Sequence, residues 1–256
     1  MERPVNPINL DEVNEFVNTN IVTFHQNRIR KVSDLKLRDI IKKNPYLLKA
    51  KNVTLASELV QEALAAKLSS SEEELFGQFL ETLAIFVAEK TTGGHKSGVT
   101  GIDLEFDDDG CHYFVSIKSG TNWGNNAQQT EQQNNFATAL RVYKQRQGQR
   151  SHVDAILGIC YGKTRTNRVR GALKLVGQNF WTFISGNRNL YKEIVEPIGY
   201  KAKEHNDEYY KALGAVTNRL EAEFIHEYCV DGVIDWGRLI EATCGNYDLN
   251  NHGFNI

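Results

Sequence analysis

The acidic and basic side chains of two neighbouring apolar runs are the residues of this sequence best suited to chemistry. Asp103 and Glu105 lie within residues 101–106, and Lys118 lies within residues 114–119. Cleavage of a phosphodiester needs a divalent cation held by hard oxygen ligands, together with a group that orients the attacking water and offsets developing charge. Asp103 and Lys118 provide both kinds of group, which indicates a Mg²⁺-dependent phosphodiesterase site.

The spacing of polar and apolar residues predicts that a β-hairpin carries these groups. Residues 99–106 and 112–119 have the composition of strands, and residues 107–110 between them have that of a hairpin turn. Side chains alternate between the two faces of a strand, so the register of the pair decides whether Asp103 and Lys118 share a face. The sequence leaves that register open.

Two further acids could complete the site. Glu131 lies near the start of the polar helix expected after Lys118, from which it could reach back over the strand ends, and it is the first candidate for a second metal ligand. Glu81 lies between Leu80 and Leu83 in a largely apolar helix. A carboxylate there is costly to desolvate unless a cation or a lysine meets it, so Glu81 could also reach the metal.

Each of these charged residues has a structural interpretation as well. An Asp and a Lys on neighbouring strands are often only a cross-strand ion pair, and a Glu on a polar helix is usually solvated. Glu105, the less favoured ligand candidate, could be the outward-facing acid of an edge strand, and Glu81 could form an ion pair with a surface lysine. The occurrence of all these groups together, followed by the polar, glycine-containing residues 119–125, favours the catalytic interpretation.

The remaining pattern predicts an α/β fold. Three serines followed by three glutamates, residues 69–74, form a capping signature that predicts a helix start at residue 72. The expected elements are helices over residues 72–90, 127–147, 172–184, 190–196 and 200–228 and near Trp236, and a strand over residues 153–161 beside the hairpin. This order predicts a mixed sheet flanked by helices, with a core over residues 71–198 and helical N- and C-terminal additions over residues 1–70 and 199–256, all within one compact domain.

The composition limits the class of protein. The 256 residues include 41% hydrophobic residues, enough for a sizeable core, and a net charge of −2 gives no overall electrostatic case for binding nucleic acid. The four cysteines are far apart and lack the paired spacing of a metal site, and neither a leader nor a membrane span is evident. These features predict a soluble protein of a reducing cytoplasm. Basic residues between Arg141 and Lys174, opposed only by Asp154, could still neutralise phosphates, but taken alone they favour a solvated surface with acids elsewhere in the fold.

The order of elements and the pattern of Asp103, Ser116 and Lys118 resemble the PD-(D/E)xK nuclease superfamily. Residues 116–125 (SIKSGTNWGN) are similar to the signature of PmeII-type type II restriction endonucleases. The resemblance extends over most of the chain through residues 35–39 (LKLRD), 43–47 (KNPYL), 69–74 (SSSEEE), 101–106 (GIDLEF), 160–162 (CYG) and 177–181 (GQNFW).

The resemblance implies roles for the site residues. Asp103 would be the metal-binding Asp and Lys118 the catalytic lysine, whereas the acid that the pattern usually places two residues before the lysine is Ser116 here. Some restriction enzymes with Ser or Cys at that position take the missing carboxylate from the following helix, where Glu131 lies. Glu81 resembles an acid that several superfamily members place on the first core helix.

The resemblance also implies a cofactor and partners. It implies Mg²⁺-dependent hydrolysis of double-stranded DNA, with Mn²⁺ as a substitute, by a homodimer that cuts both strands of a short specific site. Such an enzyme is expected in a prokaryotic cytoplasm, together with a cognate methyltransferase that is a genetic partner and not part of a stable complex.

Polar residues near the hairpin are candidates for contacting DNA. Base edges in the major groove are read by Asn, Gln, Arg and Lys, and phosphates are contacted by basic residues without sequence reading. The candidates are Asn122, Asn125, Gln128 and Gln129 beside the second strand, with Gln132, Asn134 and Asn135 further along the same helix, His95 and Lys96 before the first strand, and Lys163, Arg165, Arg168 and Arg170 in a basic loop. The amide cluster could equally be a solvated helix face, and phosphate contact is the favoured role of the loop.

Other functions stay open at this point. A structure-selective nuclease of the same fold, of resolvase or repair type, would share the site, and discrete fragments from a plasmid digest would exclude it. A non-catalytic DNA-binding relative is favoured if Ser116 leaves the site one carboxylate short. A sheet-based structural or sugar-binding module would leave Asp103 and Lys118 unexplained.

Overall fold

The chain divides into two compact units. The computed structural model describes residues 7–148 and 152–252, so residues 1–6 and 253–256 of the helical regions predicted at the two ends lie outside the described residues. The first unit comprises Met1–Phe24 and Glu74–Ala202, and the second comprises His25–Glu73 and Lys203–Ile256. The divisions near residues 24 and 73 fall inside two helices, α1 (Leu10–Ser33) and α4 (Ala56–Thr92).

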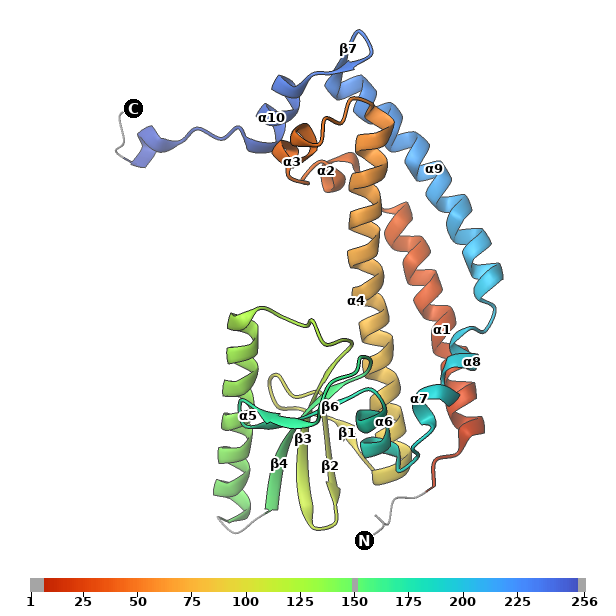
Figure 1. Ribbon diagram of the computed structural model, residues 1–256, viewed down its shortest axis with the longest axis vertical. Coiled ribbons are helices and arrows are strands. Elements are labelled where there is room, and N and C mark those ends of the chain that lie inside the picture. Colours follow the sequence, from red (N-terminus) through yellow and green to blue (C-terminus); the bar gives the residue numbers. More distant parts are fainter. Residues whose placement is uncertain (1–6, 149–151, 253–256) are drawn as a thin grey trace. The chain divides into compact units, whose positions relative to one another are not determined.

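A six-stranded mixed sheet forms the centre of the first unit, which confirms the predicted fold class. Its strands are β1 (His95–Lys96), β2 (Leu104–Asp108), β3 (Cys111–Lys118), β4 (His152–Ile159), β5 (Asn167–Val169) and β6 (Ala172–Val176). They lie in the order β1-β2-β3-β4-β6-β5 (Figure 1). The central strands β3, β4 and β6 run parallel, and the outer pairs are antiparallel. The carboxyl ends of the three central strands therefore meet at one edge, where ligands commonly bind in sheets of this kind.

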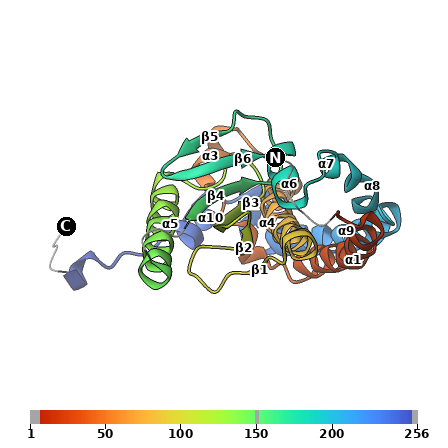
Figure 2. The same cartoon turned by 90° about the horizontal axis from the view of Figure 1, so that it is seen from below.

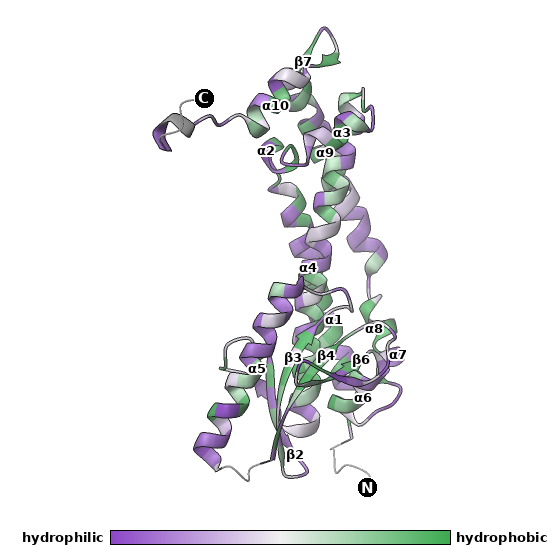
Figure 3. Cartoon of the chain, turned by 60° about the vertical axis from the view of Figure 1, so that its left-hand side comes forward, coloured by the Kyte–Doolittle hydropathy of each residue, from purple (hydrophilic) through white to green (hydrophobic). Residues whose placement is uncertain are grey.

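Helices cover both faces of this sheet. One face lies against α5 (Asn126–Gln147), and the other lies against α4 and α6 (Gln178–Ser185) (Figure 2). Phe114 of β3 belongs to the core with α5, whereas its neighbour Val115 belongs to the core with α4 and α6. Figure 3 shows β3 and β4 hydrophobic over much of their length, while α5 is mostly hydrophilic. Both faces of the central strands are buried, and α5 turns only a narrow stripe toward them.

The predicted hairpin is present, but its first strand is shorter than expected. Asp109 and Gly110 form the turn with positive φ angles of 48° and 73°, the backbone that a two-residue hairpin loop with right-handed twist requires. β2 begins at Leu104, so the strand predicted from residue 99 is wrong over its first five residues. Residues 99–103 form a loop instead, in which the Ile102 amide donates to the Val99 carbonyl over 3.1 Å.

Several expected helix boundaries are wrong. α4 continues through the serines expected to cap a helix start, because Ser70 Oγ donates to the Ala66 carbonyl within the helix over 3.1 Å, and Leu68 and Leu75 remain buried on either side. The helix expected over residues 172–184 is the strand β6 followed by α6. Gly177 separates the two with a φ of 55°.

The basic loop and the segment after α6 also differ from expectation. Residues 167–169 form β5, which pairs with β6 through a turn at Arg170 and Gly171, both with positive φ. The single helix expected over residues 190–196 is two short helices, α7 (Leu190–Glu193) and α8 (Val195–Ile198). The break at Ile194 lets both helices pack apolar side chains into the core that the sheet forms with α4 and α6.

The second unit is built largely from helices. Besides parts of α1 and α4 it contains α2 (Leu37–Ile40), α3 (Pro45–Ala50), α9 (Ala202–Tyr228), α10 (Trp236–Cys244), the hairpin of β7 (Cys229–Val230) and β8 (Val233–Ile234), and the short 3₁₀ helix η1 (Leu249–His252). Its core includes Leu59, Leu220, Phe224 and Leu239, each at most 1% exposed. Within residues 7–148 and 152–252, no helix combines the length and the apolarity needed to cross a membrane.

Candidate active site

The register of β2 and β3 places Asp103 and Lys118 on one face of the sheet. Val115 and Ile117 pack into the core against α4, so the alternating residues Ser116 and Lys118 face the side of α5. Asp103 directly precedes β2, and its amide donates to the Val115 carbonyl over 2.9 Å. Its carboxylate Oδ2 lies 3.8 Å from Lys118 Nζ. The two residues that the sequence singles out therefore lie together.

The Asp103 carboxylate is anchored by the backbone of β3. Its Oδ2 accepts a hydrogen bond from the Ile117 amide over 2.6 Å and lies 3.1 Å from Ser116 Oγ. The contact with Lys118 also falls on Oδ2, so Oδ1 lies outside these contacts. The side chains of Asp103 and Lys118 are 22% and 26% exposed, which strengthens their electrostatic interaction relative to a fully solvated pair.

Lys118 is also positioned by an aromatic ring. Its Nζ lies 5.5 Å from the ring centroid of Trp123, within the range of a cation–π interaction. Trp123 follows the end of β3 and belongs to the core packed against α5. The ammonium group is thus held between a carboxylate and an aromatic face at the edge where the parallel strands end.

A buried amide completes this part of the site. Gln132 on α5 is 8% exposed, its Nε2 donates to the Gly101 carbonyl over 2.8 Å, and its Oε1 accepts from Ser116 Oγ over 3.0 Å. The sequence placed Gln132 among the amides that could read base edges and did not predict this supporting contact. The available signal was the spacing of Gln132, Phe136 and Ala139, which places all three on one buried stripe of an otherwise polar helix.

Glu81, on α4, interacts electrostatically with Asp103 and Lys118. Its carboxylate is 32% exposed and lies 3.9 Å from Lys96 Nζ. Burial raises the pKa of Glu81, and the negative charge of Asp103 raises it further, against the opposing effect of Lys96 and Lys118. Two acids and two lysines from four segments of the chain therefore interact at this edge of the sheet.

The other two candidate ligands lie in different surroundings. Glu105 contacts His112 Nε2 over 3.3 Å and accepts a hydrogen bond from Ser97 Oγ, and Glu131 is exposed on α5. No group of three or more His, Cys, Asp or Glu side chains arranged to hold a metal occurs among the described residues. The charge of Asp103 acts on Glu81, whereas Glu105 and Glu131 lie outside the contacts of Asp103.

Some DNA-contact candidates at the start of α5 serve its N-terminal cap. Asn125 Oδ1 accepts from the Gln128 amide over 3.1 Å, and Gln128 Oε1 accepts from the Asn125 amide over 2.8 Å, which is a reciprocal capping box. Gln129 Nε2 donates to the Gly124 carbonyl over 3.3 Å. Asn122 lies exposed in the preceding loop.

Two arginines of the predicted basic loop have partners within the fold. Arg168 forms a bidentate ion pair with Asp154, with nitrogen–oxygen distances of 2.9 and 2.5 Å. Arg170 donates to Thr130 Oγ1 over 2.8 Å and to Asn126 Oδ1 over 2.6 Å, which fastens the β5–β6 turn to the start of α5. These contacts explain why the segment forms a hairpin.

The remaining basic candidates are exposed. Lys163 and Arg165 lie in the loop between β4 and β5, and within the described part of the chain neither takes part in an ion pair. His95 is exposed on β1, beside the Lys96 that approaches Glu81. These side chains are therefore accessible to a phosphate.

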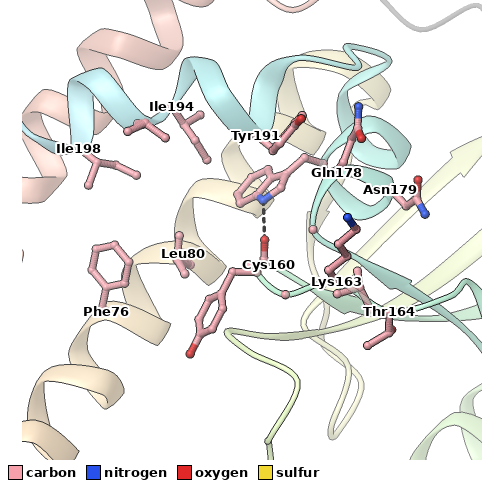
Figure 4. A pocket seen from close by; sticks show the side chains of 16 residues that line it. Phe76, Leu80, Cys160, Lys163, Thr164, Gln178, Asn179, Tyr191, Ile194 and Ile198 are labelled. Carbon is pink, nitrogen blue, oxygen red and sulfur yellow. Dashed lines mark hydrogen bonds between the residues drawn. The ribbon is translucent and has the colours of Figure 1, made fainter.

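A cavity of about 730 Å³ lies beside this edge of the sheet. Apolar side chains gather at one end of it, among them Phe76, Leu80 and Ile194, and polar ones gather at the other, among them Lys163 and Asn179 (Figure 4). Trp181 Nε1 donates to the Cys160 carbonyl over 2.9 Å in its wall.

Comparison with known proteins identifies the family. A search of curated proteins gave no match, whereas residues 11–206 match the family of the Type II restriction endonuclease EcoO109I. The match covers more than half of the chain and includes the whole charged site. It confirms the predicted class of type II restriction endonuclease, although the matched family is that of EcoO109I and not the PmeII type. The chain therefore belongs to the family of the Type II restriction endonuclease EcoO109I and is a type II site-specific deoxyribonuclease.

Proposed function

We propose that this enzyme hydrolyses phosphodiester bonds in double-stranded DNA at a short specific sequence, and that it requires Mg²⁺, for which Mn²⁺ can substitute. The observation that carries the proposal is the approach of the Asp103 carboxylate to Lys118 Nζ, 3.8 Å apart and partly buried, with Glu81 interacting with both. A carboxylate pair beside an ammonium group is the set of groups that metal-assisted phosphodiester cleavage needs.

The donor atoms fit Mg²⁺. Protein sites for this ion usually supply one or two carboxylates, and substrate phosphate and water provide the remaining oxygen ligands. The contacts of Asp103 with β3 are made by Oδ2, so its Oδ1 can bind a cation. Glu81 offers a second carboxylate. Burial and, to a lesser extent, the negative charge of Asp103 raise the pKa of Glu81, and a divalent cation would relieve both unfavourable effects. Bound there, Mg²⁺ would supply Lewis-acid stabilisation and a more acidic water.

The residues then have separate roles. Asp103 and Glu81 hold the cation, and Lys118 offsets the negative charge that develops on the phosphate and orients the attacking water. Glu131 and Glu105 stay alternative ligands from the sequence prediction. Glu131 would need to turn from the exposed side of α5, and Glu105 would need to leave His112 and Ser97.

DNA contacts are divided between phosphate and base edges in this proposal. Lys163, Arg165 and His95 are exposed and suit phosphate contact, whereas the amides of Asn122 and Gln129 suit base edges. Lys96 is shared between Glu81 and the backbone of DNA. The remaining candidates, Asn125, Gln128, Arg168 and Arg170, would shape the binding surface through their intramolecular contacts or exchange those contacts for DNA.

We infer the wider setting from the family. A homodimer would place two sites on the two strands of a symmetric sequence. A prokaryotic cytoplasm and a cognate methyltransferase acting on the same sequence follow from the proposed restriction activity. The PmeII-type subgroup stays a prediction supported by residues 116–125.

A digest of a sequenced plasmid tests the proposed function. The purified protein is incubated with Mg²⁺, with Mn²⁺ and with EDTA, and the ends of the fragments are mapped. Discrete fragments with one common end sequence, formed with either metal and absent with EDTA, are expected. Cleavage only at junctions or lesions would indicate the structure-selective nuclease, and cleavage that persists in EDTA would contradict the metal requirement.

A further inference from the structure

Gln132 is the residue of α5 that reaches Asp103 through a chain of contacts. Its Oε1 lies 3.0 Å from Ser116 Oγ, which in turn lies 3.1 Å from Asp103 Oδ2. Ser116 is fully buried and Gln132 is 8% exposed, so these polar atoms meet each other away from bulk water. Glu131, the adjacent residue, is exposed. The helix therefore directs the uncharged Gln132 amide toward the site and leaves the Glu131 carboxylate exposed.

The orientation of the Gln132 amide follows from its second contact. The Gly101 carbonyl can only accept, so the nitrogen of the amide must face it, as the 2.8 Å contact from Nε2 shows. Its oxygen is then directed at Ser116. The serine hydroxyl has one hydrogen and two acceptors, Asp103 Oδ2 and Gln132 Oε1. Gln132 can therefore hold this hydrogen whenever Asp103 Oδ2 is engaged elsewhere.

We propose that Gln132 is a positioning residue of the nuclease site. It fixes the Ser116 hydroxyl and the loop that delivers Asp103, and together with Ser116 it forms an uncharged wall at the place where the superfamily pattern has a second acid. The inference rests on the proposed function and deepens it: the cation is held by two carboxylates, from Asp103 and Glu81, and not by a third acid from α5.

This arrangement makes opposite predictions for two substitutions. Gln132→Leu removes both hydrogen bonds, so the Ser116 hydroxyl and the loop that delivers Asp103 are less firmly held, although the Ile117 amide still donates to Asp103 Oδ2. Gln132→Glu adds a carboxylate to the site and places it against the Gly101 carbonyl, which is unfavourable until a cation is bound. A divalent cation should therefore bind more tightly to Gln132→Glu and stabilise it more strongly than it stabilises the unaltered enzyme.

The test compares these variants with Gln133→Glu, which adds the same charge one residue further on, at an exposed position. Mg²⁺ and Mn²⁺ binding to the full chain without DNA is measured by calorimetry and by the metal-dependent change in Tm, and kcat and KM are measured on DNA. Gln132→Leu should lower kcat by roughly 10–100-fold, the usual effect of removing a support of a metal ligand, with KM for DNA within about twofold. Gln132→Glu should bind Mg²⁺ several-fold more tightly, and Gln133→Glu should bind it as the unaltered enzyme does.

Two results would overturn the inference: an unchanged kcat in Gln132→Leu, or equal Mg²⁺ affinities in Gln132→Glu and Gln133→Glu. If Gln132→Leu does not fold, judged by circular dichroism, the comparison of the two glutamate variants decides. Asp103→Asn and Lys118→Met are assayed in parallel. Their inactivity beside unaffected Gln132 variants would reject only the role of Gln132, whereas full activity of Asp103→Asn and Lys118→Met would reject the proposed site itself.

Discussion

The Ile117 amide lies 2.6 Å from Asp103 Oδ2, closer than either the Ser116 hydroxyl or the Lys118 ammonium group. The carboxylate is thus fixed by the backbone of the same strand that carries the lysine. A cross-strand ion pair that served only stability would need no such anchor, and at 3.8 Å and partial exposure it would contribute little, about 0–1 kcal/mol. The relationship favours a site whose geometry is set before substrate arrives.

Substitution of either member of the pair is expected to abolish cleavage and leave the fold intact. Asp103→Asn keeps an oxygen for the Ile117 amide but removes the charge, and Lys118→Met keeps most of the side-chain volume. Each should lower kcat by roughly 10²–10³-fold or more, the scale of losing one electrostatic contact to a transition state. Single-turnover cleavage with saturating Mg²⁺ measures the loss, and thermal melting should show a change in stability of no more than about 1 kcal/mol. A structural pair would give the reverse, with reduced stability and retained activity.

Glu81 and Glu131 can be distinguished by the dependence of cleavage on Mg²⁺ concentration. Glu81→Gln should shift the Mg²⁺ needed for half-maximal cleavage upward by roughly tenfold or more, because one of two carboxylate ligands is lost. Glu131→Gln is the matched control, since it makes the same chemical change at an exposed position of α5. The opposite order, with Glu131→Gln the more damaged enzyme, would assign the second ligand to α5, as the sequence predicted.

The sequence could predict the hairpin and its two key residues, but not their register. The composition around Asp109 and Gly110 specifies the turn, whereas the pairing of Leu104 with Val115 depends on which face of each strand meets the two helical layers. That choice is made by packing against α4 and α5, far away in sequence, so the approach of Asp103 to Lys118 had to come from the structure.

Buried elements account for most of the errors. Four of the five residues of β6 are apolar, Lys174 being the exception, and they do not alternate with polar ones, so the strand resembles the start of a helix. The serines within α4 are typical of a helix start, yet Ser70 satisfies its hydroxyl on the preceding turn and the helix continues. The buried contact of Gln132, which the sequence grouped with possible base-reading amides, was not predicted for a related reason. An amide on a polar helix suits solvent, DNA and a buried contact equally well, and only the surrounding structure distinguishes them.

The loop that delivers Asp103 should be sensitive to a single methyl group at Gly101. This residue has a φ of 74°, and an added Cβ would lie 2.1 Å from Asn135 Nδ2 on α5. Gly101→Ala should therefore displace the Gly101 carbonyl from Gln132 and lower both stability and kcat. Gly110→Ala is the control, because Gly110 has a φ of 73° but open space around its Cβ position. Gly110→Ala should lose about 1 kcal/mol of stability through backbone strain alone and should cleave DNA normally.

The double variant Gly101→Ala with Asn135→Ala extends this test. Removing the Asn135 side chain removes the overlap but not the backbone strain, so the double variant should regain most of the lost kcat and stay less stable than the unaltered enzyme. Equal activity in Gly101→Ala and Gly110→Ala would show that the loop does not position Asp103.

Acid should destabilise the second unit through His25. Its ring is 6% exposed and stacks on His205 with the centroids 4.6 Å apart, and burial, with lesser effects of His205 and Arg28, lowers the pKa of His25 from 6.5 to about 4. The folded chain therefore keeps His25 neutral at pH values where the unfolded chain takes up a proton. This contribution to stability is complete above pH 6.5 and is lost as the pH falls toward 4, with about 2 kcal/mol gone at pH 5.

Urea unfolding at pH 7 and pH 5 measures this loss. His25→Phe retains a stacking ring that cannot titrate, so its free energy of unfolding should fall less between the two pH values than that of the unaltered enzyme. His152→Gln, at an exposed position, is the control and should lose as much as the unaltered enzyme does. If His25→Phe and His152→Gln respond to pH alike, then His25 is not the residue that links acid to unfolding. The acid sensitivity would then have to come from carboxylates that are ionised in the folded chain, because protonation of such groups also favours the unfolded state.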